Sequence, residues 1–298
     1  MTTKTKRLPV SYLAASALVL LLAMSSCHQE NEWTPLLDRD LSRWEMYLGY
    51  KHTPDYKGDL PRDEKGEPVQ PVGYNKNVDS SFAVLEDHDG PVLRIRGEIY
   101  GCVYTKQEFE NYDLKLKVKW GDRKWPPRTD KLNDSGLLYH SIGECGVDYW
   151  RAWMLSHEFQ IMEGHMGDYW NIAGSAIDVR ALIPEGKMCA VASDRQPFLA
   201  IGTGTGRDGF CLRSEDHESP RGEWTELELI CFEDKSLHIV NGHVVMILRN
   251  SRYVEGVKSI PLSKGKIQLQ SEATEVFYKD MKIRSIRAMP DEYSSCFR

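Results

Sequence analysis

The chain has 298 residues and a formal net charge of -6 at neutral pH. This length suits one large domain or two small ones, and the even composition, which has no internal repeat, favours one. The sequence has no basic stripe interleaved with aromatic residues, which argues against nucleic acid as a partner because a surface that follows phosphates needs such a stripe.

The N-terminus predicts an exported lipoprotein. Basic residues lie among the first seven, an apolar run follows from Tyr12 to Met24, and small residues precede Cys27. The run is too short for a comfortable transmembrane helix, so we interpret residues 1–27 as a lipoprotein signal peptide. Cys27 would then carry the lipid that anchors a mature domain, residues 28–298, in the periplasm or at the cell surface. The alternative is ordinary signal cleavage, with Cys27 incidental.

From Trp33 onward the sequence predicts short β-strands. Phe82 to Leu85 and Val92 to Arg96 are short apolar or alternating runs. Asp113 to Lys119 alternates strictly between apolar and polar residues, so we expect one face of that strand to be buried and its lysine face to be hydrated.

A hairpin is predicted near the C-terminal end of the chain. Leu237 to Val240 and His243 to Ile247 flank Asn241-Gly242, a dipeptide that supplies the positive φ values of a type I′ turn. Gly265 to Gln270 and Val276 to Ile286 complete the pattern. Many short strands with turn signals between them predict an all-β fold, a β-sandwich or jelly roll.

Two irregular regions interrupt the strands, Lys51 to Asn77 and Ala192 to Ser219. The second contains the glycine-rich stretch Gly202 to Gly206, which lacks the Lys-Ser/Thr ending of a phosphate-binding loop and is interpreted as a plain loop. Long loops on a sandwich often border a binding site, so we expect at least one of the two regions to do so.

Six cysteines follow Cys27: Cys102, Cys145, Cys189, Cys211, Cys231 and Cys296. They allow fifteen complete disulfide pairings, among which the sequence does not choose. Cys231 lies in an apolar strand, which equally suits a buried free thiol. No C-x-x-C pair is present, which argues against a zinc or redox motif.

The densest group of functional residue types runs from Glu158 to Trp170, just after a second group from Asp134 to His140. Polar residues within buried strands cost free energy unless they are bonded or used, so we place a carbohydrate-active site here. Glu158 and Gln160 share one strand face, whereas Glu163 joins them only if a β-bulge or turn intervenes.

These segments resemble the 3-keto-disaccharide hydrolase family. The resemblance covers most of the mature chain and rests on the order of short motifs: Gln107 to Trp120, Asp134 to His140, Glu158 to Glu163, Gly222 to Glu228, Asn241-Gly242, Gly265 to Glu272 and Phe277 to Ile283. It implies a single concanavalin A-like β-sandwich domain that cleaves glycosides whose sugar is oxidised to a ketone at C3. It also implies a partner oxidoreductase, a sugar 3-dehydrogenase, that makes the keto sugar.

Such chemistry needs a base for the C2 proton, a group that stabilises the enolate, and an acid for the leaving oxygen. On residue type we assign Glu158 or His140 as the base, and Glu163 or His165 as the acid. Gln160 would orient the substrate.

Further residues are candidates for binding. Glu272 would contact the sugar or pair with a cation. Candidates for stacking on sugar faces are Trp150, Trp153, Tyr169 and Trp170. No cofactor is required, although a divalent metal ion held by His140, Glu158, Glu163 and His165 would polarise the ketone. The histidine spacing matches no ligand template.

Structural interpretations stand beside these functional ones. Glu158 could form an ion pair with Arg151 or Arg180, His140 could simply bond the backbone, and most tryptophans of a sandwich belong to its core.

Two other functions remain open. Glu158-x-Gln160-x-x-Glu163 is similar to the Glu-x-Asp-x-x-Glu signature of laminarinase-like retaining glycosidases, with Gln160 in place of the aspartate. The second alternative is a non-catalytic carbohydrate-binding lipoprotein.

Overall fold

The structure is a computed structural model that describes residues 32–149, 151–207 and 209–298. The predicted lipidation site Cys27 and the stacking candidate Trp150 lie outside these residues. The described part contains two short 3-10 helices, Val78–Ser80 and Asp291–Phe297, among many strands. None of its helices is long and apolar enough to cross a membrane.

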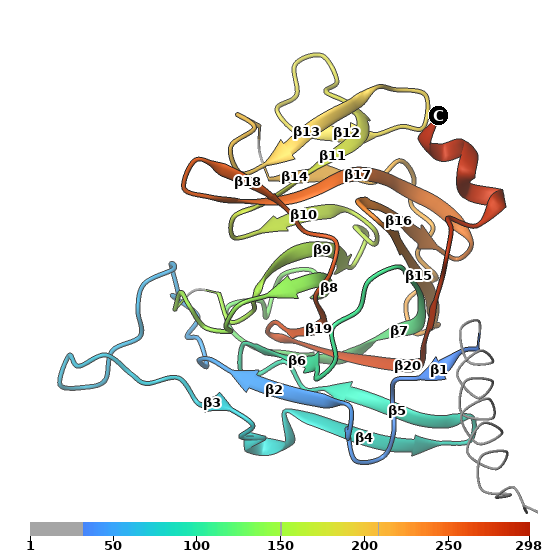
Figure 1. Cartoon of the computed structure of the whole chain (residues 1–298). Helices are drawn as coiled ribbons and strands as arrows, with labels where there is room; N and C mark the ends of the chain where they lie inside the picture. Colours follow the sequence, from blue (N-terminus) through green and yellow to red (C-terminus); the bar gives the residue numbers. More distant parts are fainter. Residues whose placement is uncertain (1–31, 150, 208) are drawn as a thin grey trace, which may run out of the picture.

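The strands form two layers that are joined at one edge (Figure 1). The order of neighbouring strands in the first layer is β4, β5, β20, β7, β15, β16, β17, β11 and β13. In addition, β1 pairs with β20 and β18 pairs with β17. Their bounds are Phe82–Asp87, Gly90–Ile95, Thr274–Ser285, Tyr112–Lys124, Thr225–Phe232, Lys235–Val240, His243–Glu255, Ser175–Leu182, Phe198–Gly202, Thr34–Pro35 and Lys258–Pro261.

In the second layer the order is β3, β2, β6, β19, β8, β9, β10, β14 and β12. Their bounds are Gly73–Tyr74, Trp44–Leu48, Gly101–Thr105, Lys266–Ser271, Asp134–Ile142, Leu155–Met162, Tyr169–Ile172, Phe210–Leu212 and Ala190–Ala192. β12 also pairs with β11, which joins the two layers. The predicted all-β sandwich is confirmed.

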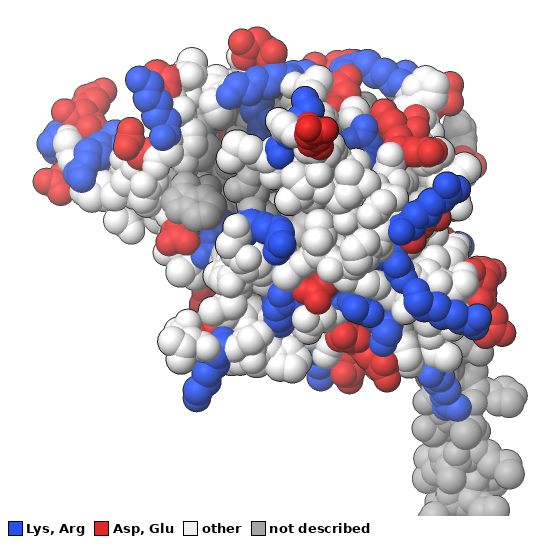
Figure 2. All heavy atoms as spheres, turned by 90° about the horizontal axis from the view of Figure 1, so that it is seen from above, with Lys and Arg blue, Asp and Glu red and all other residues white. Residues whose placement is uncertain are grey.

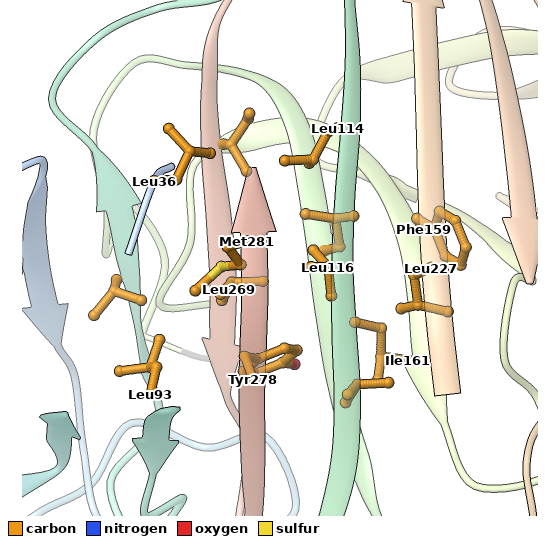
Figure 3. Close-up of a cluster of buried hydrophobic side chains, with 14 of the residues drawn as sticks. Leu36, Leu93, Leu114, Leu116, Phe159, Ile161, Leu227, Leu269, Tyr278 and Met281 are labelled. Carbon is orange, nitrogen blue, oxygen red and sulfur yellow. The ribbon is translucent and has the colours of Figure 1, made fainter. Parts of the chain in front are cut away.

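The main core fills the space between the layers (Figure 3). On β7 the alternation is as predicted, because Leu114, Leu116 and Val118 are each 1 % exposed whereas the lysines between them reach solvent. From the second layer, β9 contributes Phe159 and Ile161 to the same cluster. Burying side chains of this size stabilises the fold by roughly 1.5–3 kcal/mol each.

The predicted hairpin is also confirmed. β16 and β17 pair on either side of Asn241-Gly242, whose φ angles are 48° and 80°. No disulfide joins any of the six described cysteines in this structure, and Cys231 is buried. Basic and acidic side chains lie side by side on the face seen in Figure 2.

We expect Phe159→Ala to lower the free energy of unfolding by about 3–5 kcal/mol, because it leaves a cavity between the layers. Phe159 is 0 % exposed and stacks on His238 with ring centroids 4.3 Å apart. Chemical denaturation measures the change. Val257→Ala is the control, since Val257 is fully exposed and its truncation should leave the stability nearly unchanged.

Candidate active site

The candidate site lies on the outer face of the second layer, the face turned away from the main core. Residues directly opposite one another on neighbouring strands point to the same face of a sheet. One such row crosses β2, β6, β19, β8, β9, β10 and β14 and consists of Glu45, Tyr104, Gln268, Leu138, Glu158, Trp170 and Phe210.

Glu158 reaches its position because β8 carries a glycine beneath it. A Cβ atom at Gly136 would come within 2.2 Å of Glu158 Oε1 and 2.4 Å of Gln270 Oε1. Both side chains therefore lean over Gly136 from opposite sides, from β9 and β19. Glu158 is only 4 % exposed in this position.

Two more carboxyl groups lie close by, around one arginine. Arg128 Nη2 is 3.0 Å from Glu272 Oε1 and also pairs with Asp134 Oδ2. The phenol of Tyr100 lies beside the same guanidinium group. Arg128 acts on Glu158 by longer-range attraction alone.

This arrangement favours protonated carboxyl groups. Burial raises the pKa of Glu158 well above its ordinary value, and the negative charges of Glu272 and Asp134 raise it further. Burial and the charge of Glu272 likewise raise the pKa of Asp134, against the opposing effect of Arg128. Raised carboxyl pKa values of this origin are typical of groups that transfer protons near neutral pH.

Several acceptor oxygens around Glu158 are buried without a partner among the described residues: Asp134 Oδ1, Gln160 Oε1 and Gln270 Oε1. Unsatisfied buried acceptors are costly and call for an explanation. Hydroxyl groups of a ligand are donors of the kind that these acceptors lack.

The segment after β8 covers one side of this face. Trp153 is 7 % exposed and its ring stacks on Tyr100 at 6.4 Å. The backbone N–H of Met154 donates to Gln268 Oε1 at 3.1 Å. The first irregular region also reaches this place, because the ring of His52 lies 4.5 Å from that of Tyr100.

Of the residues predicted from the sequence, Gln160, Glu272, Trp153 and Trp170 lie on this face with Glu158. Trp170 is 39 % exposed, directly opposite Glu158, and stacks on Phe210 with centroids 4.7 Å apart. Arg151, considered as an ion-pair partner of Glu158, bonds Asp148 at 2.9 Å. Arg180 bonds the backbone carbonyl of Cys296 at 2.8 Å.

The side chains of Glu163 and His165 do not lie next to that of Glu158. β8 and β9 pair without a shift from Asp134↔Met162 to Leu138↔Glu158, so no bulge turns Glu163 onto the face of Glu158. Glu163 instead accepts hydrogen bonds from Asn133 and forms an ion pair with Arg221 at 3.1 Å. His165 Nδ1 lies 3.0 Å from Asp168 Oδ2.

His140 and Tyr169 lie on the inner side of their strands. A bulge and a φ of 52° turn His140 into the interior, where its ring lies 6.1 Å from Tyr112 and 5.3 Å from Tyr139. Burial lowers the pKa of His140 to about 4. Tyr169 is 0 % exposed, and its hydroxyl group bonds His157 Nδ1 at 3.0 Å.

The four residues considered for a divalent ion, His140, Glu158, Glu163 and His165, are thus spread over different surroundings. Among the described residues, no three His, Cys, Asp or Glu side chains are grouped as metal ligands. The cation that lies between the carboxyl groups of Asp134 and Glu272 is the guanidinium group of Arg128.

No role was predicted for Asp134, Arg128, Gln268 or Gln270. Part of the signal is present in the sequence, because Gln268, Gln270 and Glu272 stand at every second position and so share one face of an extended strand. Arg128 gave no local signal, since it lies in the connection between β7 and β8.

Comparisons with known proteins agree with the resemblance. The profile of the 3-keto-alpha-glucoside-1,2-lyase-like domain matches residues 32–284. A search of curated proteins found no match.

Solved structures with a similar fold include two proteins from Parabacteroides distasonis whose description as glycosyl hydrolases is provisional. They share 18 % and 16 % identity, cover 86 % and 85 % of this chain and 100 % and 94 % of their own, and have TM-scores of 0.43 and 0.47. LamAcat from Zobellia galactanivorans shares 12 % identity over 88 % of this chain and 99 % of its own, with a TM-score of 0.41. Similarity at this level does not transfer an activity.

We expect Gly136→Ala to disturb the site and leave the fold intact, because the new Cβ meets the ends of two side chains and no backbone. Displacing the Glu158 carboxyl group by about 1 Å should lower carbohydrate turnover or binding roughly 100-fold. Gly121→Ala is the matched control, since its Cβ would meet another carboxylate side chain, Glu275, on the first layer. Equal losses in the two variants would contradict this assignment.

Glu158→Gln should make the protein more stable at alkaline pH. The folded-state pKa of Glu158 is raised, so the wild-type protein loses stability as the pH rises through that value, whereas glutamine stays neutral. We expect a gain of about 1–2 kcal/mol at pH 8 that disappears toward pH 4. Urea unfolding across this pH range measures it. Glu163→Gln is the control and should not stabilise the protein, because it removes the ion pair with Arg221.

Proposed function

Because the chain belongs to the family of 3-keto-alpha-glucoside-1,2-lyase-like domains, we propose that it cleaves a glycoside or disaccharide whose sugar carries a ketone at C3. Membership in this family indicates a function in carbohydrate cleavage or binding. The observation that carries the proposal further is the raised pKa of Glu158 among buried acceptors that lack partners.

The proposed reaction begins with removal of a proton. A ketone at C3 acidifies the C2–H bond. Glu158 takes this proton in its ionised form, which the raised pKa makes a stronger base, and the electron pair moves onto the ketone oxygen as an enolate. Collapse of the enolate breaks the bond between C1 and the leaving oxygen and forms an enone. Water then adds across the enone, and the net result is hydrolysis.

Other residues of the face have matching roles in this proposal. Asp134, whose pKa is raised, would give a proton to the leaving oxygen. The guanidinium group of Arg128 supplies the positive field that favours a developing enolate. Gln160 and Gln270 would accept hydrogen bonds from sugar hydroxyl groups through their free oxygens, and the exposed ring of Trp170 offers a surface for stacking.

A conventional retaining glycosidase would need a second carboxyl group about 5–5.5 Å from the first. Glu158 and Glu163 do not provide it. Met162 lies four positions along the extended strand from Glu158, a distance of about 13 Å, and Glu163, the next residue, pairs with Arg221. A purely binding role explains the acceptors but requires no carboxyl group with a raised pKa.

The setting is part of the proposal. A lipid on Cys27 would hold the domain at a membrane, in the periplasm or at the cell surface. A sugar 3-dehydrogenase is the class of partner enzyme that would supply the substrate.

The test is to incubate the purified protein with a 3-keto disaccharide and with its unoxidised parent, and to follow the products by mass spectrometry. We expect cleavage of the keto sugar alone. Glu158→Gln should lower its turnover by about 10²–10⁴-fold, the usual contribution of a general base, while Glu163→Gln should retain the wild-type rate.

Each other outcome supports a different function. Cleavage of the parent sugar that is lost in both variants would favour the retaining glycosidase. Saturable binding with neither sugar cleaved after long incubation would favour the binding lipoprotein.

A further inference from the structure

Two buried cysteines lie against each other beside the candidate site. Cys102 on β6 is 0 % exposed and Cys145, in the segment after β8, is 5 % exposed. Their Sγ atoms are 3.7 Å apart. The described cysteines form no second sulfur–sulfur contact of this kind.

The position of Cys102 connects this pair to the site. Cys102 is directly opposite Gln270 on β19, and its Sγ lies 3.3 Å from Gln268 Oε1. On its other side it is directly opposite Tyr47 of β2. Cys102 thus belongs to the outer face that carries Glu158.

Cys145 lies near the start of the segment that covers this face, three residues after the end of β8 at Ile142. Its backbone N–H donates to the hydroxyl group of Tyr74 at 2.9 Å. Further along the same segment, Trp153 stacks on Tyr100 and Met154 bonds Gln268. The segment connects β8 to β9. A bond from Cys145 to Cys102 would attach it covalently to β6 as well.

We propose that Cys102 and Cys145 form a disulfide in the exported protein, which fastens the segment after β8 onto the outer face of the second layer. The Sγ atoms need to approach from 3.7 Å to about 2.0 Å, the length of a disulfide bond. We expect rotations about the Cα–Cβ bonds of the two residues to supply this movement.

The reaction is a thiol–disulfide exchange. The two thiols give up two protons and two electrons to an external disulfide, from a protein or a small molecule, which is reduced to two thiols. Burial raises the pKa of the Cys102 thiol, so the thiolate that must attack is scarce once the fold has closed. The bond therefore forms during folding and then persists, as a structural cross-link.

The test is peptide mapping of the full chain, exported by its host or refolded with oxidised glutathione. Free thiols are alkylated in denaturant without reductant, and the digest is analysed by mass spectrometry. We expect Cys102 and Cys145 on one linked peptide pair, and alkyl groups on the other four described cysteines. Treatment with reductant before alkylation should separate the pair and label all six.

Variants provide the control. In Cys102→Ser the partner Cys145 should become labelled without reductant, and in Cys145→Ser the same should hold for Cys102. Cys296→Ser, at the half-buried C-terminal helix, should leave the linked pair unchanged. The melting temperature should fall by roughly 5–10 °C in Cys145→Ser relative to Cys296→Ser.

Full labelling of Cys102 and Cys145 in the unreduced wild-type protein would overturn the proposal, as would a link between other cysteines. Because the wild-type map decides the question, the result holds even if a variant fails to fold. A missing disulfide would leave the proposed sugar chemistry untouched, since that chemistry depends on Glu158.

Discussion

The charge balance around Arg128 is the constraint on which the site depends. Three carboxyl groups share one buried region, and the single guanidinium group contacts Asp134 and Glu272 directly while it acts on Glu158 only at longer range. Charged groups that are removed from water without full pairing cost several kcal/mol, so the pKa values of these carboxyl groups are raised. A carboxyl group whose pKa is raised for this reason is suited to exchange a proton with a bound substrate.

The sandwich allows such a region because alternate residues of one strand serve different purposes. On β9, Phe159 and Ile161 belong to the main core, while Glu158 and Gln160 point to the outer face. The main core thus lies on one side of the second layer, while Asp134 Oδ1, Gln160 Oε1 and Gln270 Oε1 are left without partners on the other. A protein that gives up stability at such a place usually does so for function.

The arrangement of carboxyl groups also separates the candidate reactions. A retaining glycosidase places two carboxyl groups on opposite sides of the anomeric carbon, whereas elimination next to a ketone needs one base and a positive field for the enolate. Here Glu163 is occupied by Arg221, and the carboxyl groups that accompany Glu158 gather around Arg128 on the same face. This is why we favour the elimination.

The sequence by itself determined the class of fold, the Asn241-Gly242 hairpin, the buried face of β7 and the family, because these depend on local periodicity, turn chemistry and motif order. It also proposed Glu158, Gln160 and Glu272 for the candidate site, and all three lie on the outer face of the second layer. Only the tertiary structure decided the rest. A bulge turned His140 inward, the pairing of β9 with β10 put Trp170 outside and Tyr169 inside, and the pairing of β8 with β9 kept Glu163 away. Arg128 and Glu272 meet across 144 residues of sequence, and contacts over such separations follow from strand order and register, which local patterns do not specify.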